Sequence, residues 1–465
     1  MPEALSVGSR VRLVIHDFAA GGEAVGRIDN FVLFIPGGAP GDEVEVQVTE
    51  LKKNYGRGRI VRILKPSVQR IQPRCQNYHE CGGCHLQHVG YEAQLQFKTK
   101  MAVDALQHIA GLDQVKVRAC KPMGNPWNYR GKVQMIVGAK PYLRTSEEEE
   151  TRYRPYVGFY AQGTHSIVKI DSCHIQDQQN NSVVAAAREA MERLNWPVYD
   201  PKDGTGIVRY LVARSSKSMQ ETLLVVVASK PSLPRVNEFV DMVRKRVKHL
   251  RGVVLNLNPH RSNVVLSTRN QLLWGSEYLV EEIEGIKFHV SANSFFQVNV
   301  EGLKCIYRQL DEYLDIKPKD NVLDAYCGVG SLALYVARKA KRVVGIDECQ
   351  AAVEDAVINS DLNNFTNTDF IDGTVERVLP GLYHKGQKFR SAIIDPPRKG
   401  CDPVVIDTIA RMRIPDLVYV SCNPATLARD LGLLCERGYR VEEVQPIDMF
   451  PQTYHVECVA KIVRK

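Results

Sequence analysis

The sequence predicts mixed β and α/β architecture: a small β-barrel, an α+β middle unit and a C-terminal doubly wound, Rossmann-like parallel sheet. Two patterns carry this prediction. Residues 1 to about 65 alternate apolar and polar residues with a period of two, between turns rich in glycine and proline. From about residue 291, short apolar runs alternate with helical segments, which is typical of a parallel sheet covered by helices. We therefore expect units at 1–66, 67–290 and 291–465.

The composition is typical of a globular protein from a reducing compartment. Hydrophobic residues make up 44% of the 465 residues, and no apolar run reaches the roughly 18 residues of a membrane span. Residues 1–10 lack the charged and apolar regions of a signal peptide, so we expect a cytoplasmic, monomeric protein without a membrane partner. The twelve cysteines are then available for metal binding or catalysis rather than for disulfides.

Positive charge is concentrated in the first two units. The formal net charge is +8; residues 1–290 hold 39 Lys and Arg against 29 Asp and Glu, whereas residues 291–465 hold 22 against 24. This split indicates that the front of the chain meets a polyanion while the back performs chemistry. A solvated basic surface explains the charge alone equally well.

The first unit has the strand pattern of an OB-type barrel and a candidate RNA-binding turn. Five short alternating runs follow one another within it. The run Lys52–Arg59 sets cations beside Tyr55 on a glycine-rich turn, which suits phosphate contact and base stacking; an exposed hairpin tip is the alternative. The Gly-Glu-Ala-Val-Gly turn at 22–26 and the Gly-Arg-Gly-Arg-Ile segment at 56–60 resemble those of the TRAM domain, a small RNA-binding barrel.

A cysteine cluster opens the middle unit. Cys75, Cys81 and Cys84 form a C-x5-C-x2-C pattern in loop-like sequence, which is strong evidence for a metal site in a reducing compartment. Because such a site needs a fourth ligand, we expect Cys173, which polar residues flank, with Cys120 as the rival.

The metal is either iron or zinc. Thiolate-only ligation at tight but irregular spacing favours a [4Fe–4S] cluster. Nearby histidines leave a mixed Cys/His zinc site open: His79, His85, His88 and His174.

The rest of the middle unit has the pattern of an α+β domain. We expect a helix over 91–112, further helices near 178–195 and 234–250, and β-strands between about 127 and 290. The acidic run Glu147–Glu150 predicts a solvated hairpin tip. The unit also carries cations to which we assign no individual RNA contact: Arg130, Lys132, Arg209 and Arg214.

The C-terminal unit begins with a strand that leads into a glycine turn. This strand ends in Asp324, and Gly328 and Gly330 follow in an Asp-x-x-x-Gly-x-Gly pattern. A glycine turn after the first strand of such a sheet lets a cofactor approach the backbone. Because the third glycine of the dinucleotide fingerprint is missing, the turn suits a cofactor without a pyrophosphate. It resembles motif I of S-adenosylmethionine-dependent methyltransferases.

Further acids follow the next strands. Asp347 ends the second strand, 23 residues after Asp324, where a carboxylate can accept hydrogen bonds from ribose hydroxyls; a helix N-cap is the alternative. Asp372, after the third strand, is a weaker candidate for the adenine end. Asp395 ends the fourth strand, and the stiff double proline after it points toward the crevice, so Asp395 can orient cofactor or substrate.

Cys422 ends the fifth strand at the same edge of the sheet as these acids. A thiol in this position, with a helix beginning beyond Pro424, lies near helix-terminal amides that lower its pKa and make it nucleophilic. An isolated cysteine is more often simply buried. The converging acids favour the catalytic interpretation.

Five segments resemble the RNA uracil-5 methyltransferase family, and with the barrel and cysteines the likeness covers nearly the whole chain. The segments are Ser294–Asn299, Asp324–Gly330, Asp395–Arg398, Ser421–Asp430 and Phe450–Glu457. The resemblance implies methyl transfer from S-adenosylmethionine to RNA. It points to the branch that acts on 23S ribosomal RNA and carries an iron–sulfur cluster, rather than to the transfer-RNA branch.

The same resemblance implies roles for individual residues. S-adenosylmethionine would be bound by Gln297, Tyr326, Asp347 and Asp395. Cys422 would add to carbon 6 of a flipped uridine, and Glu457 would remove the proton from carbon 5; His455 is the rival base. Asp347 stands where many members have glutamate. The family also implies that the helix at 91–112 packs against the C-terminal unit.

Other functions remain as alternatives. A transfer-RNA uracil-5 methyltransferase would share the whole catalytic unit. An RNA cytosine-5 methyltransferase would need a second cysteine in the stretch that here is Asp395-Pro-Pro-Arg398. A non-catalytic RNA-binding or electron-transfer iron–sulfur protein would need neither the glycine turn nor Cys422. Radical S-adenosylmethionine chemistry would present C-x3-C-x2-C rather than the spacing found.

Overall fold

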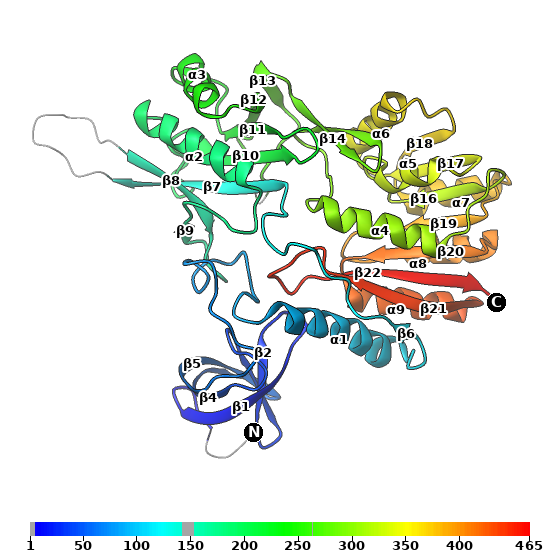
Figure 1. The fold of residues 1–465 in the computed structure, drawn as a ribbon, viewed down its shortest axis with the longest axis horizontal. Coiled ribbons are helices and arrows are strands. Elements are labelled where there is room, and N and C mark those ends of the chain that lie inside the picture. Colours follow the sequence, from blue (N-terminus) through cyan, green and yellow to red (C-terminus); the bar gives the residue numbers. More distant parts are fainter. Residues whose placement is uncertain (1–4, 142–152, 263) are drawn as a thin grey trace, which may run out of the picture.

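The computed structural model describes residues 5–141, 153–262 and 264–465. The acidic run Glu147–Glu150, for which we expected a hairpin tip, lies outside these residues. The described parts form a small barrel, a middle sheet and a C-terminal sheet, and Figure 1 shows them as three groups. Among the described helices, none has the length and apolarity needed to cross a membrane.

The N-terminal barrel is closed, in the order β1-β2-β3-β5-β4 with β4 pairing back onto β1. Its strands are β1 (Arg10–Phe18), β2 (Ala24–Ile28), β3 (Phe31–Ile35), β4 (Glu43–Leu51) and β5 (Tyr55–Lys65). Alternation with a period of two turns every second side chain inward, so Leu33 and Ile35 are fully buried with Val44 and Val46. The predicted five-stranded barrel is confirmed.

The middle sheet has the order β13-β12-β11-β10-β7-β8-β9. Its elements are β7 (Lys132–Pro141), β8 (Tyr153–Tyr160), β9 (Ile167–Lys169), α2 (Gln178–Arg193), β10 (Val208–Ser216), β11 (Glu221–Ala228), α3 (Val236–Arg246), β12 (Leu250–Leu257) and β13 (Asn270–Gly275). Apolar faces of α2 and α3 cover the sheet, and Trp196 stacks on Phe239 of α3 at 4.1 Å between ring centres.

A two-stranded hairpin connects the middle sheet to the C-terminal unit. It consists of β14 (Tyr278–Ile283) and β15 (Ile286–Ser291). Leu279 packs with the middle sheet, whereas Phe288 belongs to the core of the C-terminal unit. The hairpin therefore contributes to both cores.

The C-terminal sheet has the order β18-β17-β16-β19-β20-β22-β21-β6. Its elements are α4 (Val300–Tyr313), β16 (Asn321–Ala325), α5 (Ser331–Ala337), β17 (Arg342–Asp347), α6 (Gln350–Leu362), β18 (Thr368–Asp372), α7 (Val375–His384), β19 (Ser391–Ile394), α8 (Pro403–Met412), β20 (Asp416–Ser421), α9 (Pro424–Glu436), β21 (Tyr439–Ile447) and β22 (Glu457–Arg464). Pairing is parallel from β18 to β20, and β22 then joins antiparallel. The strand order reverses between β16 and β19, the position where such sheets bind ligands.

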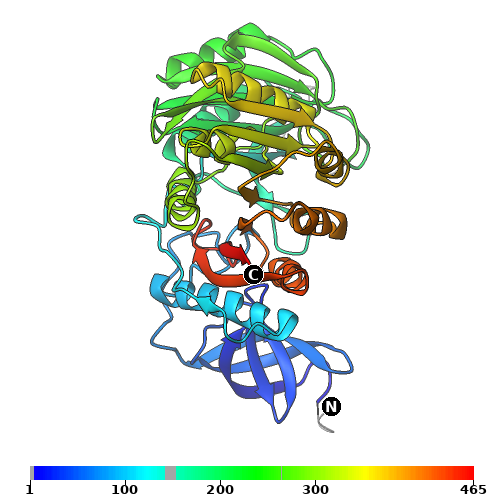
Figure 2. The ribbon, with the colours of Figure 1, turned by 90° about the vertical axis from the view of Figure 1, so that its right-hand side faces the viewer.

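An early segment of the chain also belongs to this sheet. Strand β6 (Lys116–Val117) pairs parallel with β21 at the sheet edge. Helix α1 (Tyr91–Ala110) buries Leu95 and Leu106 in the same core as α9. On its other side, Phe97 contacts Phe18 of the barrel, with ring centres 4.9 Å apart. Both views place α1 between the barrel and the C-terminal strands (Figures 1 and 2).

Candidate active site

Cys422 lies at the turn between β20 and α9, as the sequence predicted. Asn423 caps the helix by accepting a hydrogen bond from the Ala425 amide at 3.1 Å, and Pro424 occupies the first helical turn. The cysteine is partly buried. The strand–turn–helix geometry thus presents the sulfur at the carboxyl edge of the sheet.

Glu457 is brought to Cys422 by strand pairing. Strand β20 is antiparallel to β22, and the last pair of their ladder joins Ser421 to Cys458. Cys422 and Glu457 are the next residues beyond that pair, so the ladder brings them to the same edge of the sheet. Glu457 is 4% exposed and is flanked on its other side by Ile447 of β21. The charge of Glu457 raises the pKa of Cys422, after the larger effect of burial, which shows that the two groups interact.

Arg398 supplies the positive charge of this site. Its carbonyl oxygen accepts hydrogen bonds from the Asn423 side chain at 3.1 Å and from the Thr426 hydroxyl at 3.3 Å, so the Asp-Pro-Pro-Arg loop is tied to the cysteine turn. Its positive charge lowers the pKa of the Cys422 thiol. The sequence motif predicts a role for Asp395 only, and the tertiary structure adds Arg398 of the same motif to the site.

The expected low pKa of Cys422 is wrong for the ligand-free protein. Burial, and then the charges of Glu457 and Asp395, raise the pKa of the thiol, and Arg398 only partly opposes them. Two acids next to a partly desolvated sulfur outweigh the helix-terminal amides that the sequence suggested.

The acids of the site hold protons more tightly than free carboxyl groups. Burial and the charge of Asp347 raise the pKa of Asp395 to about 7. Burial and the charge of Asp395 raise the pKa of Glu457 well above its usual value, against the effect of Arg398. Burial and Arg398 lower the pKa of His455 to about 4, so this ring is neutral and weakly basic at pH 7.

The glycine turn after β16 has the backbone of a ligand-binding loop. Tyr326, Gly328 and Gly330 have φ values of 67°, 54° and 79°, a region that a tyrosine rarely adopts without a functional or structural reason. A Cβ added at Gly328 would meet no atom within 4 Å, so space is open beside the turn. Beneath it, Asp324 is fully buried and neither carboxylate oxygen meets a suitably placed donor among the described residues.

Asp347 connects the glycine turn to the next strand. Its carboxylate accepts hydrogen bonds from the Gly328 amide at 2.9 Å and from the Cys349 amide at 2.9 Å. It pairs in register with Asp372 at the end of β18, so these two acids share the carboxyl edge of the sheet. The ladder therefore brings together the two positions expected for the ribose and adenine ends.

Gln297 lies apart from this group of acids. It occupies the loop before α4, where it lines a small cavity with Arg214 and Glu281. Tyr326 points elsewhere as well, because its hydroxyl donates a 3.4 Å hydrogen bond to Glu376. In the ligand-free structure these two predicted cofactor residues flank the site rather than converge on Asp347.

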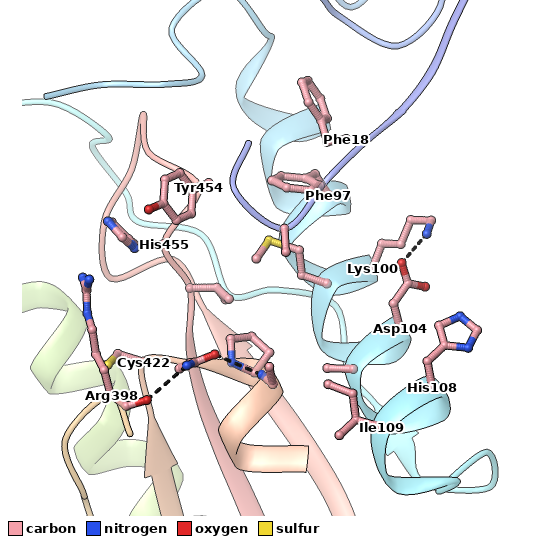
Figure 3. A pocket seen from close by; sticks show the side chains of 17 residues that line it. Phe18, Phe97, Lys100, Asp104, His108, Ile109, Arg398, Cys422, Tyr454 and His455 are labelled. Atoms are coloured by element: carbon pink, nitrogen blue, oxygen red, sulfur yellow. Dashed lines mark hydrogen bonds and ion pairs between the residues drawn. The ribbon is translucent and has the colours of Figure 1, made fainter. Parts of the chain in front are cut away.

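A cavity of about 430 Å³ opens beside Cys422. Figure 3 shows Arg398, Tyr454 and His455 on one side of it and α1 on the other, with Phe18 of the barrel at its upper end. The cavity therefore brings the barrel, the early helix and the catalytic edge together around one thiol.

The four predicted metal ligands line a second cavity, of about 440 Å³. Cys75, Cys81, Cys84 and Cys173 all face it. Burial raises the pKa of Cys84 to about 12 and that of Cys173 to about 11, with smaller contributions from neighbouring cysteines. Within the described residues, no three Cys, His, Asp or Glu side chains are close enough together to hold a single metal ion.

The alternative ligands are placed differently. Cys120 is buried in the core of the C-terminal unit. His88 is also buried, where its ring contacts the Tyr78 hydroxyl at 2.6 Å and the Gly38 carbonyl at 2.7 Å. His174 alone among the four histidines lines the cysteine cavity. The tertiary structure thus favours Cys173 over Cys120.

A doubly wound sheet with a glycine turn after its first strand and acids at the following strand ends defines the class of proteins that bind a nucleoside-containing cofactor at the carboxyl edge of the sheet. Family models agree: one described as tRNA (Uracil-5-)-methyltransferase matches residues 236–465, and a TRAM domain model matches residues 4–61.

Relatives extend the likeness to the whole chain. An RNA methyltransferase of Halalkalibacterium halodurans, described as uncharacterized, is 38% identical over 455 residues, 98% of this chain and 97% of the relative. A similarly described protein of Caldanaerobacter subterraneus is 39% identical over 460 residues, 99% of each chain. The crystal structure of Pyrococcus abyssi tRNA (uracil-54, C5)-methyltransferase with S-adenosyl-L-homocysteine is 28% identical, with a TM-score of 0.76 over 97% of this chain and 99% of that one. This chain belongs to the S-adenosylmethionine-dependent RNA uracil-5 methyltransferase family.

Proposed function

We propose that the protein methylates carbon 5 of a specific uridine in 23S ribosomal RNA, with Cys422 as nucleophile and Glu457 as base. The observation that carries the residue assignment is the end of the β20–β22 ladder, whose last pair is followed by Cys422 on one strand and Glu457 on the other, close enough for the charge of Glu457 to raise the pKa of Cys422. Arg398 and Asp395 complete a small group of charges around the sulfur.

The residues present fit S-adenosylmethionine. The open space beside Gly328 leaves room for a ligand next to the glycine turn. Asp347 and Asp395 would contact it from the strand ends, and Tyr326 and Gln297 would approach from the flanks. When bound, this cofactor supplies an electrophilic methyl group on its sulfonium.

The side chains can supply the remaining chemistry. The Cys422 thiolate adds to carbon 6 of uracil, and the ring electrons move to carbon 5, which becomes nucleophilic enough to accept the methyl group. Glu457 then takes the proton from carbon 5, and the sulfur leaves carbon 6 as thiolate. Glu457 takes this proton in its ionised form. Ionised Glu457 is a stronger base than His455, because the pKa of Glu457 is raised well above its usual value whereas that of His455 is lowered to about 4.

The thiol must first lose its proton. Its raised pKa leaves it mainly protonated in the free protein, and Arg398 stabilises the thiolate once it forms. Binding of RNA expels water from the cavity beside Cys422, which strengthens this ion pair. The target base must leave its stack to reach the sulfur, because carbon 6 is otherwise covered by neighbouring bases.

We further propose that the cysteine cavity holds a [4Fe–4S] cluster. Each iron of such a cluster binds one thiolate, so the four sulfurs stand further apart than around one zinc ion. Four cysteines around one cavity supply the four thiolates that such a cluster needs. Arg130 and Lys132 line the same cavity and would offset the negative charge of the thiolates.

Transfer RNA is the second candidate substrate. The Pyrococcus abyssi enzyme, which resembles this chain over its full length, acts on uracil 54 of tRNA. The proposal for ribosomal RNA rests on the resemblance of the sequence motifs to the ribosomal branch of the family; the barrel does not discriminate, because the full-length match to the tRNA enzyme includes it.

Mapping of 5-methyluridine decides between these substrates. We expect a strain lacking the gene to lose this base at one or more 23S positions and to keep it in tRNA. The purified protein should restore it on the unmodified ribosomal RNA. Loss confined to tRNA would establish the second candidate, and an unchanged pattern in both RNAs would reject the proposed activity.

A further inference from the structure

The turn that precedes Glu457, residues 448–456, is held by residues from the first quarter of the chain. We propose that Gln94 of α1, with the backbone of His85 and Leu86, positions this turn so that Glu457 faces Cys422. The inference rests on the proposed role of Glu457 as base. It makes Gln94 a positioning residue for proton removal.

Gln94 is the centre of the contact. It is 1% exposed, and its side chain and Gln452 bond each other reciprocally: the Gln94 amide donates to the Gln452 side-chain oxygen at 3.1 Å, and the Gln452 backbone amide donates to the Gln94 oxygen at 3.1 Å. The Gln94 amide also donates to the carbonyls of Leu86 at 3.0 Å and Val89 at 2.9 Å. The buried side-chain amide of Gln94 thus joins helix α1 to residues 86–89 and to the turn at Gln452.

The cysteine segment reaches the same residue of the turn. The backbone amides of His85 and Leu86 both donate to the Gln452 carbonyl, at 2.9 and 3.0 Å. His85 follows Cys84 directly in the chain. The position of Cys84 therefore also determines the positions of the two backbone amides, of His85 and Leu86, that donate to the turn before Glu457.

The first part of the turn is held in the same way. Asp448 forms a fully buried ion pair with Lys98 and accepts a 2.7 Å hydrogen bond from the Tyr91 hydroxyl. Lys98 also donates to the Phe450 carbonyl at 3.1 Å. Three side chains spaced along α1 therefore contact the turn at successive points.

The conformation of the turn itself requires such support. Gln452 has a φ of 69°, a left-handed conformation that costs free energy for a residue with a side chain. It persists only where surrounding contacts enforce it, and Gln94, His85 and Leu86 supply those contacts. Losing them would let the turn relax and move Glu457, five residues on, relative to Cys422.

This placement separates two steps of the proposed reaction. Cys422 is held by β20 and α9. Among the described residues, the side-chain hydrogen bonds of Gln94 reach Leu86, Val89 and Gln452 but neither of these two elements, so thiol addition should survive a relaxed turn. Proton removal by Glu457 should slow, because a displacement of about 1 Å can cost a catalytic group about a hundredfold in rate. A mispositioned base therefore traps the covalent RNA adduct, whereas general destabilisation lowers adduct and turnover together.

The test compares Gln94→Ala with Gln96→Ala, which removes an exposed glutamine two residues away on the same helix. The full-length protein is mixed with S-adenosylmethionine and unmodified RNA from a strain lacking the gene. Turnover and the protein–RNA adduct on denaturing gels are both measured. We expect Gln94→Ala to turn over at least about tenfold more slowly and to accumulate adduct, while Gln96→Ala behaves as the wild type. Hydrogen exchange should rise at residues 449–456 in Gln94→Ala alone.

Two further variants complete the design: Tyr91→Phe, which is milder than Gln94→Ala, and Glu457→Gln, which removes the proposed base itself. Tyr91→Phe removes the hydroxyl that donates to Asp448 and accepts from the Met123 amide at 2.9 Å, and it should show the same change to a smaller extent, even if Gln94→Ala folds poorly. The positioning role would be overturned if adduct and turnover fell in parallel, or remained unchanged, in both Gln94→Ala and Tyr91→Phe. If Glu457→Gln fails to accumulate adduct, the base assignment falls and the positioning role with it. If adduct accumulates in Glu457→Gln but in neither Gln94→Ala nor Tyr91→Phe, the positioning role is rejected and the base assignment stands.

Discussion

Cys422 and Glu457 lie next to the last pair of the β20–β22 ladder, close enough for the charge of Glu457 to raise the pKa of Cys422, although Glu457 comes 35 residues later in the sequence. The antiparallel addition of β22 beside β20 creates this relationship. In a sheet that stayed parallel, the start of β22 would lie at the opposite edge from Cys422. The sheet topology therefore places a thiol and a carboxyl group together where the other strands deliver their acids.

The first prediction concerns the nucleophile. Cys422→Ala should abolish both methyl transfer and the covalent RNA adduct, because the sulfur is the group that adds to carbon 6. Binding of S-adenosylmethionine, measured by calorimetry, should change by less than about threefold, since the glycine turn and Asp347 are untouched. Residual turnover by this variant would refute the assignment.

The second prediction concerns the base. Glu457→Gln keeps the size of the side chain but cannot accept the carbon-5 proton. Turnover should fall by about 10²–10⁴-fold, while the methylated adduct accumulates and becomes visible on denaturing gels. His455→Gln serves as the comparison, and we expect it to retain turnover. If His455→Gln traps the adduct instead, the two roles are reversed.

The third prediction follows from the raised pKa of the Cys422 thiol. Because the reactive form is the thiolate, alkylation of Cys422 by iodoacetamide should accelerate as pH rises from 7 to 10. Arg398→Gln removes the charge that lowers this pKa, so its rate profile should shift to higher pH. Peptide mass spectrometry distinguishes Cys422 from the other eleven cysteines. An unshifted profile would mean that Arg398 does not stabilise the thiolate.

The fourth prediction concerns the cysteine cavity. Protein purified without oxygen should contain about four iron atoms and absorb visible light, as expected for a [4Fe–4S] cluster. Cys173→Ser should lose both properties, whereas Cys120→Ser should keep them because Cys120 lies in the catalytic core. A colourless protein with one zinc ion would exclude the cluster.

The fifth prediction concerns stability and pH. Burial, and then the charge of Asp395, raise the pKa of Asp324 well above its unfolded value. The folded state then binds a proton that the unfolded state releases, so the free energy of unfolding falls as pH rises above about 4. Asp324→Asn removes this titration. The free energy of unfolding is measured in urea for both proteins at pH 5 and pH 8. The difference between the variant and the wild type should be larger at pH 8 than at pH 5, by at least about 1 kcal/mol in favour of the variant. A pH-independent difference would contradict the shift.

Local patterns were sufficient to predict the architecture. Period-two alternation is a property of neighbouring residues, so segments such as Phe31–Ile35 could be assigned to a barrel in advance. Strands that end in acids, as at Asp347 and Asp395, indicated a ligand edge because parallel strands align their carboxyl ends. The family resemblance depended on short motifs of the same local kind, and the comparisons agree with it.

Other features depended on which distant segments meet. The sequence placed Cys422 near helix amides, but only the tertiary structure put Glu457 and Asp395 close enough to raise its pKa rather than lower it. It also joined Gln94 to Gln452 across 358 residues. Long-range charge and hydrogen bonding depend on distance in space, which neither spacing nor periodicity encodes. The sequence by itself thus determined the fold class and the chemical groups, and the tertiary structure decided their protonation and their support.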